Sequence, residues 1–259
     1  MNTALIFIIL LLAHASVWFF VSLLKKRNDV ADVAWGLGFL LFTWASFVLF
    51  YPAGPRGFLV SLLVSVWSLR LAWHIAMRHK GKPEDFRYAV WRADWGRWFY
   101  LRSYFQIYLL QGFLSLVVVL PVLFINAGVG VALTWLDVLG FFIWALGFYF
   151  EVVGDRQLSR FIKNPANKGK LMQEGLWAWT RHPNYFGEVT LWWGLYLMAL
   201  SVPWGWISIF GPATITFLIL KVSGIPMLEK KMAENPEFLS YKERVSIFIP
   251  LPPRKSKSL

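Results

Sequence analysis

The sequence predicts an all-α, polytopic membrane protein with seven transmembrane helices in a single domain over residues 1–250. Apolar residues make up 58% of the 259-residue chain and charged residues only 15%, which is more apolar than a soluble domain. The charged residues are also clustered and leave uncharged runs at 1–24, 33–55, 103–136 and 189–220. Because a helix needs about 20 residues to cross the hydrocarbon core, such runs are typical of membrane spans.

These runs and their flanks predict seven helices in order along the chain. Five are single spans, at 3–24, 34–51, 57–77, 105–125 and 135–153. The last run is too long for one helix and contains Pro203 and Gly205, so we expect a tight turn there. The two helices on either side, 185–200 and 205–222, are short for a hydrocarbon core about 30 Å thick.

The basic residues indicate how these spans are oriented. Of the 26 lysines and arginines, 24 fall in 25–27, 78–102, 156–181 and the region from Lys221 onward. These segments alternate with the spans so that all lie on one side of the membrane. Lys and Arg collect in cytoplasmic loops, so we expect the N-terminus outside and the C-terminus inside. The net charge of +12 then reflects topology, and we expect no nucleic-acid partner.

This topology predicts a multi-pass membrane protein, with the lipid bilayer as its partner and an active site facing the cytoplasm. Both long loops, 78–104 and 154–184, lie on the cytoplasmic side. The basic and aromatic stretch after Pro83 is typical of an amphipathic helix on anionic lipid. We expect residues 251–259 to form a basic, disordered tail. The sequence carries no indication of an oligomeric state.

Few ionisable residues fall at membrane depth, where they are costly and are therefore candidates for function. Arg70 and His74 are four residues apart on the third helix, and Glu151 and Asp155 are four apart on the fifth. Each pair therefore shares a helix face. In one interpretation the two helices meet and the opposite charges pair, which would be a structural role. In the other, the two carboxylates bind a ligand that is cationic or donates hydrogen bonds.

The densest group of polar residues lies where a basic loop leads into the sixth helix. Pro183 suits the first turn of a helix. Arg181 and His182 just before it, together with the free amides of that turn, are typical of an anion-binding site. Asn184 and Glu188 share one helix face and offer an amide and a carboxylate to a polar ligand.

Four motifs follow one another in the C-terminal half: Glu151-Val-Val-Gly-Asp155, Asn164-Pro-Ala-Asn-Lys-Gly-Lys170, Gly175-Leu-Trp with Arg181-His-Pro-Asn-Tyr-Phe-Gly-Glu188, and Leu228-Glu with Tyr241-Lys-Glu-Arg and Ile249-Pro250. In this order and spacing, residues 135–250 resemble the C-terminal region of the steroid 5-alpha-reductase superfamily, in particular its uncharacterised bacterial membrane branch. Members are seven-helix membrane reductases that use NADPH to reduce a carbon–carbon double bond conjugated to a carbonyl.

The resemblance implies roles for several residues. Asn184 and Glu188 hold positions that contact the nicotinamide end of the cofactor, Asp155 makes a further polar contact, and Lys170 lies near the phosphates. With the anion site before the sixth helix, the expected cofactor-binding residues are Glu151, Asp155, Lys170, Arg181, His182, Asn184, Tyr185 and Glu188.

The chain also departs from the steroid reductases. It has Glu151 where they have Asn, and Lys231 where they have His. The family's substrate-activating Glu and Tyr lie in the N-terminal half, which does not align. Asp32, Arg70 and His74 are therefore the candidate catalytic residues in that half.

The predicted function is hydride transfer from NADPH to a carbonyl-conjugated double bond of a lipophilic, steroid-like small molecule. The alternative is an S-adenosylmethionine-dependent methyltransferase of the isoprenylcysteine or phospholipid type, because those membrane enzymes share an Arg-His-Pro-x-Tyr-x-Gly block. A more remote alternative is a transporter or scaffold that uses the buried charges for a pathway or for packing. The chain contains no cysteine, and we expect no metal.

Overall fold

The computed structural model describes residues 2–128 and 132–254, which are helical apart from loops and one isolated bridge between Thr180 and Ser246. This confirms the all-α class. The chain divides into two compact units. Unit 1 comprises Met1–Thr134 and Ala199–Gly211, and unit 2 comprises Trp135–Met198 and Pro212–Leu259. The single domain expected over residues 1–250 stays a prediction.

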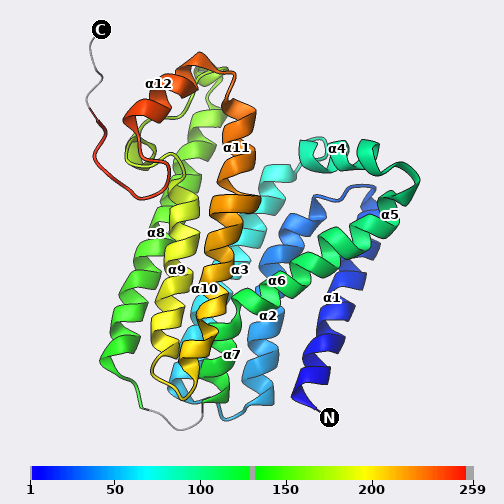
Figure 1. Ribbon diagram of the computed structural model, residues 1–259, viewed down its shortest axis with the longest axis vertical. Helices are drawn as coiled ribbons and strands as arrows, with labels where there is room; N and C mark the ends of the chain where they lie inside the picture. Colours follow the sequence, from blue (N-terminus) through cyan, green and yellow to red (C-terminus); the bar gives the residue numbers. More distant parts are fainter. Residues whose placement is uncertain (1, 129–131, 255–259) are drawn as a thin grey trace. The chain divides into compact units, whose positions relative to one another are not determined.

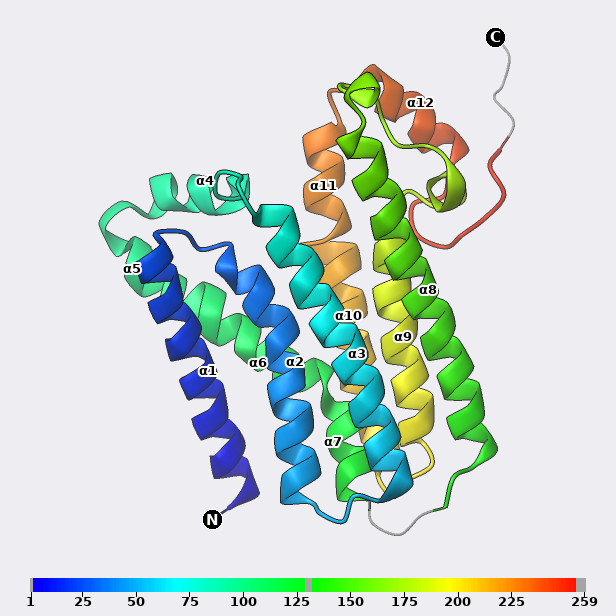
Figure 2. The same ribbon diagram turned by 180° about the vertical axis from the view of Figure 1, so that it is seen from behind.

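Unit 1 is built mainly from long helices, which Figures 1 and 2 show from opposite sides. Its elements are α1 (Thr3–Lys25), α2 (Val30–Leu49), α3 (Gly54–His79), α4 (Phe86–Trp95), a 3-10 turn (Gly96–Trp98), α5 (Phe99–Arg102), a π-helical segment (Ser103–Leu109), α6 (Leu110–Val118), α7 (Leu120–Ala127) and a second 3-10 helix (Gly205–Ile209).

Local sequence signals explain where several of these helices begin and end. The Asn2 side chain caps α1 by accepting a hydrogen bond from the Ala4 amide at 3.0 Å. Lys26, with φ at 55°, ends α1 in the left-handed conformation. Proline in the first turn suits the starts of α3 and α7. The run Phe86–Val118 meets α7 at a bend of 50°.

Unit 2 comprises α8 (Trp135–Lys163), two 3-10 turns (Pro165–Asn167 and Gly175–Ala178), α9 (Pro183–Ala199), α10 (Phe210–Phe217), a π-helical segment (Leu218–Val222), α11 (Ile225–Met232) and α12 (Pro236–Arg244). Glycines let α8 and α9 approach closely. A Cβ added at Gly147 would lie 2.6 Å from the Gly187 carbonyl oxygen, and one at Gly194 would lie 2.6 Å from the Gly140 carbonyl oxygen. Such small-residue contacts are typical of helix pairs in membranes.

Several helices match the expected spans. Within the described residues, α1, α2, α3, α8 and the run Gly205–Met232 are long and apolar enough to cross a membrane, and the bent pair ending in α7 makes a sixth candidate. α9 has 17 residues, fewer than the roughly 20 that a span needs. A multi-pass membrane protein is thus supported with five or six candidate spans, while seven spans and their orientation stay predictions.

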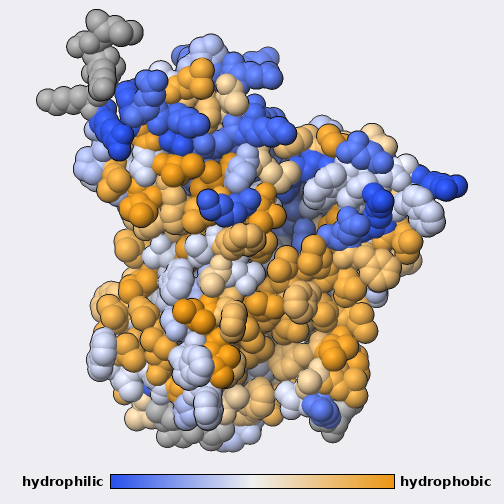
Figure 3. All heavy atoms as spheres, viewed as in Figure 1, coloured by the Kyte–Doolittle hydropathy of each residue, from blue (hydrophilic) through white to orange (hydrophobic). Residues whose placement is uncertain are grey.

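The surface of each unit agrees with this interpretation. Apolar residues cover the sides of the helices, whereas hydrophilic residues gather over α4 in unit 1 and over α11 and α12 in unit 2 (Figure 3). The amphipathic helix expected after Pro83 is present as α4. In the expected tail, the Leu251 and Arg254 amides donate to backbone carbonyls at 3.0 and 2.9 Å. Residues 255–259 lie outside the described residues, and the disorder of the tail stays a prediction.

Candidate functional site

Asp32, a predicted catalytic residue, lies in the first turn of α2 and accepts two short hydrogen bonds from α4. Arg87 Nη2 donates to one carboxylate oxygen and the Tyr88 hydroxyl donates to the other, each at 2.7 Å. Tyr88 is only 1% exposed, so the contact lies inside unit 1. The guanidinium is bonded to the carboxylate, and the carboxylate is bonded to a buried phenol, which is a group that can donate a proton.

Acidic side chains at the starts of α2 and α4 fasten these two segments together. Asp29 accepts from Arg27 Nε and Nη2 at 2.6 and 2.5 Å, and from the Asp85 amide at 3.1 Å. Asp85 caps α4 through the Arg87 amide at 3.1 Å. These contacts fix where α4 begins and therefore how Tyr88 is directed toward α2.

The carboxyl groups of Asp29 and Asp85 are more acidic than usual. Burial by itself raises the pKa of Asp29, but hydrogen bonds from Arg27 and from the Asp85 amide outweigh burial and leave this pKa lowered. Burial likewise acts to raise the pKa of Asp85, and the hydrogen bond and charge of Arg87 outweigh it and lower the pKa. Both carboxylates are therefore ionised at neutral pH.

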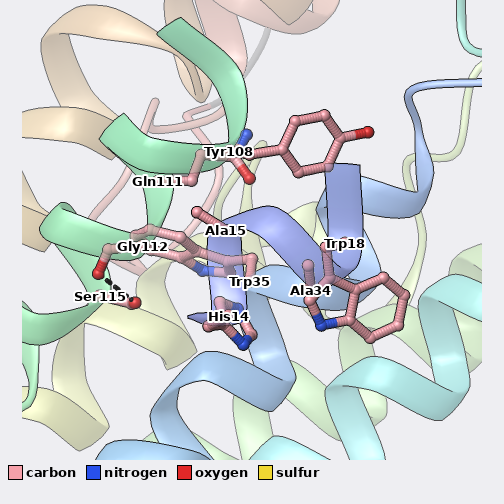
Figure 4. Close-up of a pocket in the computed structure, with 9 residues that line it drawn as sticks. All are labelled: His14, Ala15, Trp18, Ala34, Trp35, Tyr108, Gln111, Gly112 and Ser115. Carbon is pink, nitrogen blue, oxygen red and sulfur yellow. Dashed lines mark hydrogen bonds between the residues drawn. The ribbon is translucent and has the colours of Figure 1, made fainter. Parts of the chain in front are cut away.

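A small cavity lies beside the Asp32–Tyr88 pair, between α1, α2 and α6. Its volume is about 10 Å³, and its lining includes His14, Trp18, Trp35, Tyr108, Gln111 and Ser115. Figure 4 shows the Gln111 side chain on one side of the cavity and the His14 imidazole on the other. Tyr88 packs in one hydrophobic cluster with Ala15, Trp18 and Tyr108, which line the cavity, so the cavity adjoins the Asp32–Tyr88 pair.

The other two predicted catalytic residues lie on α3. Arg70 and His74 are both partly buried and both interact with neighbouring groups. His79, also on α3, approaches an acid of unit 1, since its Nδ1 lies 3.8 Å from Asp29 Oδ2. A catalytic role for Arg70 and His74 stays a prediction.

In unit 2, the seam between α8 and α9 brings together three of the predicted cofactor-binding residues. Asn184 Nδ2 donates to Asp155 Oδ1 at 3.1 Å. Glu151 lies one turn earlier on α8, and its amide nitrogen would be 2.5 Å from a Cβ added at Gly187. Glu151 and Asp155 are 2% and 7% exposed. Glu188 follows one turn later on α9, so a carboxamide and three carboxylates lie along one stretch of two helices.

Arg181 and His182 are also buried, and both contact the later part of unit 2. Arg181 Nε and Nη2 lie 2.8 and 2.7 Å from Glu229 Oε1. Arg181 Nη1 donates to the Lys242 and Val245 carbonyls at 3.1 and 2.6 Å. His182 Nε2 lies 3.3 Å from the same Glu229 oxygen. Each guanidinium nitrogen thus has a partner within the chain, and anion binding by Arg181 and His182 stays a prediction.

The chain that follows α12 runs along the loop that precedes α9. The Arg181 amide donates to the Ser246 carbonyl at 2.9 Å, and Thr180 Oγ1 donates to the Phe248 carbonyl at 2.8 Å. This segment therefore covers the start of α9. The helix itself begins at Pro183, which the sequence predicts for its first turn.

Two predicted cofactor residues remain. Tyr185 stacks on His182 with ring centroids 5.7 Å apart, and Lys170 is exposed on a loop.

Reasoning from the sequence missed three residues that the structure places at these sites. Tyr88 was part of a stretch interpreted as a lipid-surface helix, Gln111 lay in an uncharged span, and Glu229 lay within a motif with no assigned role. For Tyr88 a signal was present. In α4, Tyr88, Trp91 and Trp95 recur at helical spacing and pack in one cluster, which indicates a buried face.

The two units thus define a helical, multi-pass membrane protein with an acid–tyrosine pair in one unit and a carboxamide–carboxylate seam in the other. The chain belongs to a family described as a protein of unknown function (DUF1295), whose model matches residues 18–245. This family is similar to the steroid 5-alpha-reductases, which supports the resemblance at that level, while the bacterial branch stays a prediction.

Two curated proteins are similar to parts of the chain. An uncharacterized protein of Schizosaccharomyces pombe is 23% identical over 267 residues, covering 89% of this chain and 74% of its own length. A probable O-methyltransferase, ustE of Ustilaginoidea virens, is 45% identical over 53 residues, covering 20% of this chain and 18% of its own length. No solved structure matches the chain.

Proposed function

We propose that the protein is a membrane-embedded reductase that transfers a hydride from NADPH to a carbonyl-conjugated double bond of a lipophilic, steroid-like molecule. The observation that carries this proposal is the buried Tyr88 hydroxyl, which is hydrogen-bonded to Asp32 at 2.7 Å beside a small cavity. An acid and a tyrosine are the groups that the family resemblance implies for activating the substrate. Here they meet although they are 56 residues apart in the sequence.

In this proposal unit 1 activates the carbonyl. When the substrate binds, the single hydroxyl hydrogen of Tyr88 turns from Asp32 to the carbonyl oxygen, where negative charge develops as the double bond is reduced. Before the substrate binds, Asp32, itself held by Arg87, positions the phenol. The hydride is added to the carbon β to the carbonyl, and a proton from water completes the reduction at the α carbon.

Unit 2 offers groups that fit the cofactor. Asn184 supplies an amide and Asp155 and Glu188 supply carboxylates, a set that complements the donor and acceptor of a nicotinamide carboxamide. Exposed cations near the end of α8 suit the phosphates of NADPH: Arg156, Arg160, Lys163, Lys168 and Lys170. When bound, NADPH supplies the hydride.

Ligand stabilisation of the purified protein tests the choice of cofactor, because a ligand that binds only the folded state raises the melting temperature. We expect NADPH to raise it at lower concentration than NADH or S-adenosylmethionine does. NADPH should also be oxidised when a steroid-type enone is added to the protein in detergent. A shift with S-adenosylmethionine alone would reject the reductase.

A methyltransferase that uses S-adenosylmethionine is the second candidate. The similarity to a probable O-methyltransferase over 53 residues favours it. The same ligand-stabilisation measurement separates the two candidates, and transfer of a labelled methyl group from S-adenosylmethionine to a lipid extract would support this second candidate directly.

We also propose seven spans in a bacterial inner membrane, with the N-terminus outside and the active site facing the cytoplasm. The concentration of basic residues in alternate loops supports this topology. Reporter fusions at residues 128 and 170 should report opposite sides of the membrane, with residue 170 inside. A fusion at residue 170 that reports the outside would overturn the orientation.

A further inference from the structure

Three large apolar side chains are exposed within five residues of the chain that follows α12. The exposed fractions are 45%, 60% and 50% for Ile247, Ile249 and Leu251. Between them, Phe248 packs on Phe186 of α9, with ring centroids 5.7 Å apart. We name residues 247–251 the apolar segment. It is held against unit 2 through Phe248, while its other large side chains face outward.

The loop that precedes α9 lies where the apolar part of α8 ends. α8 is long and apolar enough to cross a membrane, and its first basic residues, Arg156 and Arg160, come shortly after Gly154. Trp177 Nε1 donates to the Gly154 carbonyl at 3.1 Å, and a Cβ added at Gly154 would lie 3.1 Å from Pro183 Cγ. If α8 crosses a membrane, the start of α9 therefore lies at the boundary between hydrocarbon and head groups.

The apolar segment lies beside this loop and therefore at the same level. The Leu251 amide donates to the Trp179 carbonyl at 3.0 Å, and the Arg181 amide donates to the Ser246 carbonyl at 2.9 Å. In Figure 1 the red chain that follows α12 turns back toward the start of α9. Trp179 is itself 47% exposed, and tryptophan is enriched where a membrane meets water. The exposed apolar side chains of this region thus lie at the level expected for lipid head groups.

The composition of this part of the chain suits partial insertion into lipid. A backbone N–H without a partner is costly in an apolar environment. Pro250, Pro252 and Pro253 have no N–H, and the N–H of Leu251 is already bonded. After Glu243 the sequence has four basic residues and no acidic one. Apolar side chains next to a basic patch are typical of segments that bind anionic membrane surfaces.

We propose that the apolar segment binds the surface of an anionic lipid leaflet, with its three exposed side chains among the upper acyl chains and Arg254 beside lipid phosphates. Arginine pairs well with phosphate. Lipid then covers an apolar surface that the described residues leave exposed, and it keeps the C-terminal segment over the start of α9. This inference goes beyond the proposed function, because it requires neither a cofactor nor turnover.

A single fluorophore at residue 249 tests the proposal. The chain contains no cysteine, so Ile249→Cys provides one site for a polarity-sensitive label in the full-length protein. In nanodiscs that contain phosphatidylglycerol, we expect blue-shifted emission, strong quenching by lipids with a spin label near the head group, and little quenching by acrylamide in the water. Ser240→Cys on α12, which is also exposed, is the matched control and should show the opposite pattern.

Changes of lipid and of charge test the remaining part of the proposal. Each cation strengthens binding to an anionic surface about fivefold, so nanodiscs of phosphatidylcholine alone should make residue 249 more accessible to acrylamide. Arg254→Gln should have the same effect in the anionic nanodiscs. Leu251→Cys repeats the measurement at a second exposed position.

Three results would overturn the proposal. The first is equal accessibility of residues 249 and 240 to acrylamide, which would place the apolar segment in water. The second is protection of residue 249 from both quenchers, because a protein surface would then cover it. The third is the same accessibility in neutral and anionic nanodiscs. All of these measurements are made without NADPH, so they are independent of whether reductase activity is found.

Discussion

The Tyr88 hydroxyl donates to Asp32 Oδ1 at 2.7 Å and so joins α4 to the first turn of α2. If Tyr88 polarises a carbonyl, Tyr88→Phe removes the donor to the developing negative charge, and kcat should fall about 10²- to 10³-fold. Tyr104→Phe is the matched control, because the Tyr104 hydroxyl bonds to Ser16 at 3.1 Å on a partly exposed face. Steady-state NADPH oxidation measures both variants, and an equal loss in the two would remove Tyr88 from the mechanism.

The seam between α8 and α9 predicts a strong effect of a single added methyl group. In Gly187→Ala the new Cβ would lie 2.5 Å from the Glu151 amide nitrogen, and backbone atoms cannot move aside without separating the helices. We expect a loss of about 1–3 kcal/mol in the free energy of unfolding, as overpacking typically causes. Gly112→Ala is the comparison, since its Cβ would meet the end of the Leu11 side chain at 2.7 Å and His14 only at 4.0 Å, with no backbone atom among these contacts. Chemical denaturation in detergent should show a clearly smaller loss there.

The lowered pKa values of Asp29 and Asp85 predict acid sensitivity. A carboxyl whose pKa is lower in the folded than in the unfolded state stabilises the protein fully above the unfolded value, about 3.9 for Asp. That stability is lost as the pH falls through the folded value. The melting temperature should therefore decrease when the pH is lowered below about 4. Asp29→Asn should flatten this part of the profile, whereas Asp94→Asn, at an exposed position, should leave its shape unchanged.

The ion pair between Arg181 and Glu229 allows a test of whether Arg181 has a structural or an anion-binding role. Glu229→Gln leaves the Arg181 guanidinium, which is 5% exposed, without its charged partner, and such losses cost about 3–5 kcal/mol of stability. Glu243→Gln at an exposed position should cost little. If Arg181 instead binds the cofactor phosphates, Glu229→Gln should tighten NADPH binding, because the competing carboxylate is gone. Thermal unfolding and NADPH titration of the same samples distinguish these results.

Glu188 is expected to accept a hydrogen bond from the nicotinamide carboxamide. Glu188→Gln keeps the size and removes the charge, so it should lose about 1.5–3 kcal/mol of binding free energy, which is the value of a hydrogen bond to a charged group. NADPH affinity should drop on the order of tenfold to a hundredfold, with the melting temperature of the free protein little changed. Glu174→Gln, on an exposed loop, is the control. Lower stability with unchanged NADPH affinity would contradict a cofactor role.

The helices were predictable from the sequence to the extent that they follow apolar runs. α1, α2 and α3 fall within four residues of the expected bounds, because lipid-facing runs identify such helices without knowledge of their packing. α8 extends ten residues beyond the expected end at 153, because its last three turns carry charges and no longer resemble a span. The α9 start at Pro183 was predictable from proline chemistry.

The sites were predictable only where their residues are close in the sequence. Asp155 and Asn184 are 29 residues apart, on the consecutive helices α8 and α9, and their hydrogen bond follows from the packing of these two helices. The bonds from Tyr88 to Asp32 and from Arg181 to Glu229 join residues 56 and 48 positions apart. Such pairs depend on how loops fold back, and neither periodicity nor charge patterning in one sequence contains that information.

The segment that lies along residues 179–182 has a consequence for synthesis of the protein. The loop before α9 is hydrogen-bonded to Ser246, Phe248 and Leu251, all of which the ribosome makes more than 60 residues later. During translation, α9 is therefore made while its first turn is still uncovered. The contacts of this turn form only after α12 and the segment to Leu251 have left the exit tunnel, so this end of unit 2 is completed last.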